Sequence, residues 1–131
     1  MTQRSAVVID DEADITAYLS TLLSDHGWTV RTANGVEQGL KLLALERPDA
    51  VLLDLMMPDR GGLTALVAIR KDPSLAGLPV IIVSGIQEKL TSDYHAFLAR
   101  AKHHRPDAYL DKPVNPKELL QTLEKLVAAP V

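Results

Sequence analysis

The chain of 131 residues contains no cysteine, one phenylalanine and one tryptophan. Without cysteine it can form no disulfide and offers no thiolate to a metal. No apolar stretch is long enough to cross a bilayer or to serve as a secretory signal, so we expect a cytoplasmic protein with no membrane contact. The formal net charge is -3 and no basic stripe is present, which argues against direct binding to nucleic acid.

Short apolar runs each lead into a chemically capable side chain. Such runs, rich in β-branched residues and apolar throughout, are typical of strands buried on both faces of a parallel sheet. In these sheets ligands bind beyond the carboxyl ends of the strands. We therefore expect one shared site from the residues that follow runs 6–9, 50–53, 80–83 and 108–110, which are Asp10 and Asp11, Asp54, Ser84, and Asp111 and Lys112.

Strand-like runs alternate with helical spacing along the whole chain. The pattern predicts strands at 6–9, 28–32, 50–54, 80–83 and from 108, and helices at 15–23, 36–45, 63–71, 87–104 and 116–127. Gly27 is expected to end the first helix, Asn34 to cap the second and Asn115 to begin the last. Five such units imply an α/β fold, one doubly wound parallel sheet covered by five helices, in a single domain over residues 1–131.

Asp54 is the candidate nucleophile. An aspartate that ends a strand can simply be a turn or cap residue, but the segment after Asp54 contains no strong helix start. A carboxylate in a loop at a sheet edge can attack phosphorus and form an aspartyl phosphate. Such a transfer depends mainly on positioning and on neutralising charge.

Asp10 and Asp11 suggest how the charge is neutralised. Adjacent acids could merely favour the N-terminus of the following helix, which would not explain three carboxylates at one edge. A hard divalent cation would relieve their repulsion, and Mg²⁺ suits carboxylates, waters and phosphate oxygens. The absence of histidine and cysteine there argues against zinc.

Lys112 and Ser84 complete the predicted site. Lys112 could be a solvated surface charge and Ser84 a turn residue. Placed at strand ends, the ammonium can pair with Asp54 and then with a phosphoryl oxygen, and the hydroxyl can donate to another oxygen. Gly85 would leave space for the group.

Several segments that contain these residues resemble those of a known protein family. In the segments Val8-Ile9-Asp10-Asp11, Asp54 with Met57-Pro58 and Gly62, Ser84-Gly85, and Tyr109-Leu110-Asp111-Lys112-Pro113, the chain resembles the receiver domain of two-component response regulators. The resemblance covers essentially the whole length. It implies a flavodoxin-like fold with sheet order 2-1-3-4-5 and a signalling switch rather than a turnover enzyme. No output domain is expected in this chain.

The resemblance also implies roles. Asp54 would accept a phosphoryl group from a histidine kinase or histidine phosphotransfer protein. Mg²⁺, which Mn²⁺ could replace, would be held by Asp10, Asp11, Asp54 and the Met56 carbonyl. Ser84 and Tyr109 would form a switch pair, and the Lys112-Pro113 bond would be cis. The fourth helix, fifth strand and fifth helix would bind a downstream protein partner.

Two departures from the family pattern stand out. Met56 is apolar where the family often carries a polar residue, so we expect Met56 and Ile86 to shield the acyl phosphate, unless they only pack. The basic segment Arg100 to Arg105 lies in a longer connection than usual. It is interpreted as a solvated helix end or a partner surface, and a histidine metal site there fits poorly because adjacent helical residues diverge.

Two other functions compete. A haloacid-dehalogenase-like phosphatase also uses an aspartate nucleophile and Mg²⁺, but its second acid would fall at Met56. A degenerate receiver that serves only as a scaffold is opposed by the retained acids, Ser84 and Lys112. The sequence leaves the cognate kinase, the output and homodimerisation on activation open.

Overall fold

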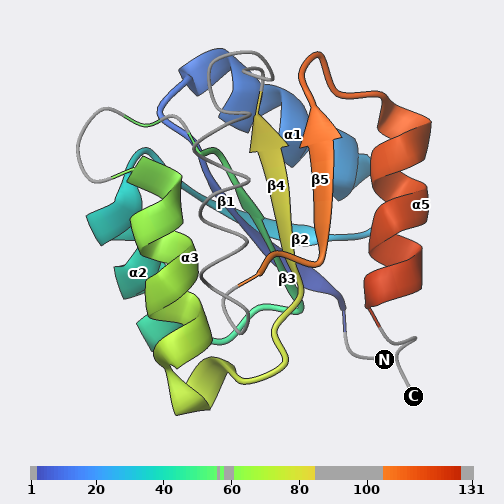
Figure 1. The fold of residues 1–131 in the computed structure, drawn as a ribbon. Coiled ribbons are helices and arrows are strands. Elements are labelled where there is room, and N and C mark those ends of the chain that lie inside the picture. Colours follow the sequence, from blue (N-terminus) through green and yellow to red (C-terminus); the bar gives the residue numbers. More distant parts are fainter. Residues whose placement is uncertain (1–2, 56, 58–60, 85–104, 128–131) are drawn as a thin grey trace.

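The computed structural model describes residues 3–55, 57, 61–84 and 105–127. Their strands form one parallel sheet in the order β2-β1-β3-β4-β5 (Figure 1). The strands are β1 (Ser5–Ile9), β2 (Thr29–Ala33), β3 (Ala50–Leu53), β4 (Val80–Ser84) and β5 (Ala108–Asp111). The predicted α/β sheet and its order are confirmed.

Helices cover both faces of the sheet. Those described are α1 (Ala13–Asp25), α2 (Val36–Leu45), α3 (Gly61–Lys71) and α5 (Pro116–Leu126), with a short 3₁₀ turn η1 (Pro73–Leu75) after α3. Helices α1 and α5 lie on one face, and α2 and α3 lie on the other (Figure 1). The helix predicted at 87–104 lies outside the described residues.

Strand β1 divides the core between the two faces. Val7 and Ile9 belong to the cluster under α2 and α3, whereas Ala6 and Val8 belong to the cluster under α1 and α5. Successive side chains of a strand point to opposite faces, so a strand that is apolar throughout is buried on both. This burial leaves the carboxyl end of the sheet as the place for polar groups.

Gly39 fixes the distance between α2 and the sheet. A Cβ atom at this position would come within 2.8 Å of Ile9 Cγ1, so glycine lets the helix lie directly on β1. Glycine inside a helix costs roughly 1 kcal/mol relative to alanine. Close helix-sheet packing accounts for its presence.

Helix α1 ends and helix α5 begins at the residues that the sequence predicted. Gly27 ends α1 with φ +87°, and its N–H donates to the Ser24 carbonyl while Trp28 N–H donates to that of Leu23, the bonding of a Schellman motif. Asn115 caps α5 by accepting from Glu118 N–H at 3.1 Å.

The prediction that Asn34 caps α2 is wrong. Gly35 is the N-cap residue, in an extended conformation. Asn34 instead donates its backbone N–H to Gln38 Oε1 at 3.0 Å. The side chain of Gln38 reaches back over the first turn, so the helix starts one residue later than the polar side chain suggested.

Within the described part of the chain, no helix has both the length and the apolar character that crossing a membrane requires.

Candidate functional site

Ladder hydrogen bonds hold three polar residues at the carboxyl edge of the sheet. Asp10 N–H donates to the Ala33 carbonyl at 3.0 Å, and Asp54 N–H donates to that of Ile9 at 3.0 Å. Lys112 N–H donates to the Ser84 carbonyl at 3.1 Å. Each bond extends the strand pairing one residue past the strand, so the backbone positions of these residues are set by the sheet itself.

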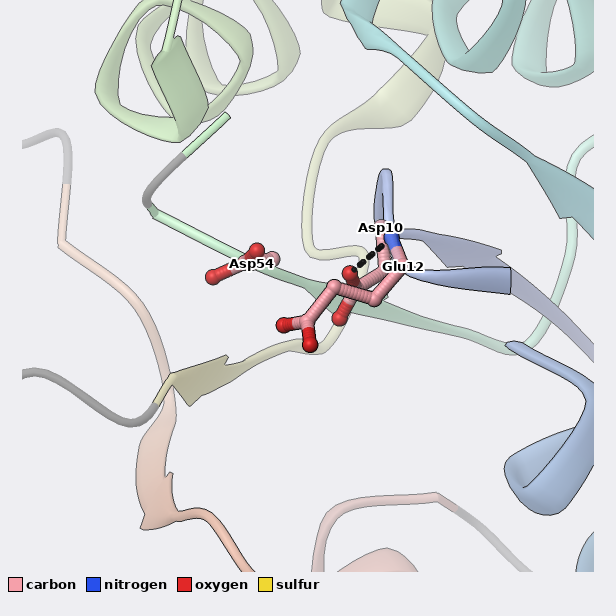
Figure 2. Close-up of side chains that lie close together, drawn as sticks. All are labelled: Asp10, Glu12 and Asp54. Atoms are coloured by element: carbon pink, nitrogen blue, oxygen red, sulfur yellow. Dashed lines mark hydrogen bonds between the residues drawn. The ribbon is translucent and has the colours of Figure 1, made fainter. Parts of the chain in front are cut away.

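Three carboxylates converge at this edge. Oxygen atoms of Asp10, Glu12 and Asp54 all lie within 4.8 Å of one another, and the side chains converge in Figure 2. Asp10 is 2% exposed and Asp54 3% exposed, whereas Glu12 is exposed. Two buried acids and a third, exposed acid therefore form one acidic group at the carboxyl edge of the sheet.

The Lys112 ammonium lies within this acidic group. Its Nζ is 2.8 Å from Asp10 Oδ2, 2.8 Å from Glu12 Oε1 and 3.7 Å from Asp54 Oδ2. The sequence predicted a resting pair with Asp54; the structure adds two shorter contacts. Three carboxylates and one ammonium give this group of four described side chains a formal net charge of -2.

Burial and neighbouring charges shift the pKa values of Asp10 and Lys112. Burial, assisted by the charge of Asp54, raises the pKa of Asp10 and outweighs the hydrogen bonds from Lys112 and Glu12 N–H. Burial alone would lower the pKa of Lys112, but its contacts with Asp10, Glu12 and Asp54 together raise the pKa by more than burial lowers it. The pKa of Lys112 therefore lies above the ordinary value, and the residue remains an ammonium at neutral pH.

Ser84 brings a buried hydroxyl to the end of β4. The residue has no exposed surface, and its Oγ has no hydrogen-bond partner among the described residues. Buried polar groups in proteins are nearly always paired, so this hydroxyl is suited to a bound group. Tyr109 on β5 lies close enough for Ser84 to influence the pKa of its phenol. The geometry between Ser84 Oγ and the phenol is nevertheless not that of a hydrogen bond.

Tyr109 is partly buried and packs against the cluster under α2 and α3. Burial raises the pKa of its phenol, and the neighbouring negative charge of Asp111 raises it further. At neutral pH the side chain therefore carries no charge that would resist movement into or out of the apolar cluster.

Glu12, which the sequence analysis did not place in the site, belongs to the acidic group, whereas Asp11 does not. Asp10 Oδ1 accepts a hydrogen bond from Glu12 N–H at 2.9 Å, an Asx turn that folds the chain back over Asp10. The turn directs Glu12 toward Lys112 and leaves Asp11 exposed. The sequence signal that could have identified Glu12 is its position two residues after Asp10, the aspartate that follows β1.

Several predicted positions fall outside the described part of the chain. Met56, Gly85, Ile86 and residues 100–104 lie outside the described residues. Arg105, the last residue of the basic segment, is described, and its carbonyl accepts a hydrogen bond from Arg70 Nε at 2.8 Å. The Lys112–Pro113 peptide bond is cis.

Comparisons with known proteins agree on one family. The model described as the response regulator receiver domain matches residues 6–124. Protein PilH of Pseudomonas aeruginosa is 32% identical over 122 residues, covering 93% of this chain and 96% of PilH. The transcriptional regulatory protein KdpE of Staphylococcus aureus is 31% identical, covering 89% of this chain and 47% of KdpE.

Solved structures extend the likeness to three dimensions. The chemotaxis response regulator CheY4 of Vibrio cholerae has a TM-score of 0.82 at 25% identity, covering 96% of this chain and all of CheY4. A response regulator receiver domain protein from Clostridium thermocellum has a TM-score of 0.78 at 29% identity, covering 94% and 93%. The chain thus spans nearly all of PilH but about half of the transcriptional regulators that it matches.

Proposed function

Because the chain belongs to the response regulator receiver domain family, we propose that Asp54 accepts a phosphoryl group from a histidine kinase or histidine phosphotransfer protein. The chain is a receiver domain of two-component signalling, a switch rather than a turnover enzyme. The observation that supports the acceptor role is the contact of the buried Asp54 carboxylate with Lys112 beside Asp10.

In this reaction an Asp54 oxygen attacks phosphorus and the bond from phosphorus to the donor imidazole nitrogen breaks. The electron pair of that bond leaves with the imidazole, and Asp54 becomes an acyl phosphate. Lys112 can then donate to a phosphoryl oxygen, because its ammonium already lies 3.7 Å from Asp54 Oδ2. The unpartnered hydroxyl of Ser84 can donate to a second oxygen.

The acidic group fits a divalent cation. Its donors are carboxylate oxygens, which Mg²⁺ prefers and which Mn²⁺ also accepts. Asp10 and Asp54 would hold the ion together with Asp11 and the Met56 carbonyl, the set that the family resemblance implies. When bound, the cation would neutralise charge on the phosphoryl group during transfer.

The switch would run from the site through β5 to the partner surface. Ser84 would turn toward the phosphoryl group, and Tyr109 would move inward into the vacated space. The neutral phenol of Tyr109 favours that movement. Strand β5 and helix α5, together with the helix predicted at 87–104, would form the surface that a downstream protein, or a second copy of the chain, recognises.

Phosphorylation by a small donor tests the acceptor role. The protein is incubated with acetyl phosphate and Mg²⁺, and the intact mass is measured for the wild type and for Asp54→Asn. We expect one added phosphoryl group on the wild type and none on Asp54→Asn, and no addition when a chelator removes the cation. Equal labelling of the two proteins would refute Asp54 as acceptor.

A further inference from the structure

Glu12 makes an ion pair that the acceptor mechanism does not use. Its Oε1 lies 2.8 Å from Lys112 Nζ, as close as the buried Asp10 carboxylate. The Glu12 side chain is 59% exposed, whereas that of Lys112 is 13% exposed. An acid at the solvent rim therefore holds one side of a largely buried ammonium.

This pairing decides where the ammonium lies. Lys112 Nζ is 2.8 Å from each of Asp10 and Glu12, but 3.7 Å from Asp54 Oδ2. Glu12 stands at the start of α1, fixed by its backbone N–H to Asp10 Oδ1. The ammonium is thus drawn toward the rim and away from the carboxylate that is to be phosphorylated.

We propose that Glu12 is a positioning residue that holds Lys112 off Asp54 before the divalent cation binds. The inference rests on the proposed function and adds a step before phosphoryl transfer. A cation and an ammonium repel each other and compete for the same carboxylates. With Glu12 present, Lys112 keeps an acidic partner at the rim while the cation takes Asp10 and Asp54.

Without Glu12 the competition changes. The acids still in contact with the ammonium are then Asp10 and Asp54, which the cation also needs. Lys112 would settle between these two carboxylates, and an entering cation would have to displace it. Loss of Glu12 therefore weakens cation binding through Lys112.

Titration calorimetry with Mg²⁺ alone tests this role. We expect Glu12→Gln to weaken Mg²⁺ binding roughly fivefold, in the range of a partly exposed ion pair. Glu12→Asp keeps the charge but shortens the reach, so it should show a similar loss. Asp14→Asn, an exposed acid in the first turn of the same helix, should bind as the wild type does.

The Lys112→Met background separates positioning from simple charge. If Glu12 acts through Lys112, adding Glu12→Gln to Lys112→Met changes Mg²⁺ affinity by less than about twofold. An equal loss in both backgrounds would make Glu12 a direct ligand and overturn the proposal, as would wild-type affinity in Glu12→Gln or Glu12→Asp. Melting temperatures without Mg²⁺ confirm that every variant is folded.

The outcome is independent of the acceptor test. Coupling between Glu12 and Lys112 can hold even if acetyl phosphate does not label Asp54, in which case the proposed function fails alone. Normal labelling of Asp54, with no effect of Glu12 on Mg²⁺ affinity, removes this inference alone.

Discussion

Gly62 brings the start of α3 against the backbone of the acceptor residue. A Cβ atom at this position would overlap the Asp54 carbonyl oxygen and come within 2.5 Å of Leu55 Cα. Gly62 N–H also donates to the Leu55 carbonyl at 3.1 Å. The missing side chain thus helps to fix where the Asp54 carboxylate lies.

Gly62→Ala should therefore lower both stability and labelling. Overpacking against rigid backbone costs about 1–3 kcal/mol in free energy of unfolding, and a displaced Asp54 should take up phosphoryl groups more slowly from acetyl phosphate. Urea unfolding and the labelling rate measure the two effects. Gly35→Ser, where an added Cβ meets open space, is the control; equal behaviour of both variants would contradict the steric argument.

Tyr109 should titrate above its ordinary value. Burial and then Asp111 raise its pKa from 10.0. The neutral phenol therefore contributes stability that is fully present below pH 10.0 and is lost as the pH rises through the folded pKa. In a phenolate absorbance titration, the component removed by Tyr109→Phe should appear above pH 10.0. A component at or below that pH would count against the described environment.

At this scale the sequence predicted the backbone-fixed residues and missed the one placed by a turn. Asp10, Asp54 and Lys112 follow strands, so strand prediction alone brings them to one edge. Glu12 joins the acidic group through the Asx turn at Asp10 and its own long side chain. Such a turn depends on side-chain geometry that apolar periodicity does not encode.

At the scale of elements, Arg70 ties α3 to the starts of β4 and β5. Its Nη1 donates to the Leu78 carbonyl at 2.7 Å, and its Nη2 lies 2.8 Å from Asp107 Oδ2. Asp107 Oδ2 also accepts from Val80 N–H at 2.8 Å. One guanidinium, with its further bond to the Arg105 carbonyl, therefore links three elements at the end of the sheet opposite the site.

Arg70→Met should cost about 2 kcal/mol in free energy of unfolding. The substitution leaves the partly buried Leu78 carbonyl without its charged donor and removes the ion pair with the exposed Asp107 carboxylate, which together account for this magnitude. Urea unfolding measures the change, with Lys71→Met, an exposed neighbour, as the matched control. Superimposable unfolding curves for the two variants would show that the linkage adds nothing to stability.

Element prediction succeeded where patterns are local. The apolar runs located β1, β3 and β4, and Gly27 and Asn115 located the ends of α1 and α5. The cap of α2 was misplaced because Asn34 and Gly35 both suit a helix start, and the choice depends on Gln38 reaching back to Asn34.

At the scale of the molecule, the order of the strands came from the family resemblance. Alternating strands and helices indicate a parallel sheet but leave many strand orders open. The structure has the order β2-β1-β3-β4-β5, with α1 and α5 packed on one face of the sheet and α2 and α3 on the other (Figure 1). The same arrangement gathers the acidic group from the ends of more than one strand.

Mg²⁺ should therefore stabilise the whole fold. A ligand that binds only the native state adds about 2.7 kcal/mol at one hundred times its Kd, so the melting temperature should rise with Mg²⁺ concentration. Asp11→Ala should abolish the increment if Asp11 is a ligand. An undiminished response would mean that the cation binds elsewhere, without Asp11.

The most direct test of the account locates the phosphoryl group itself. Protein phosphorylated by acetyl phosphate with Mg²⁺ is treated with borohydride, which reduces an aspartyl phosphate to homoserine, and its peptides are sequenced by mass spectrometry. The account predicts homoserine at position 54. Homoserine at position 10 or 11, or unchanged aspartate at position 54 in labelled protein, would contradict it.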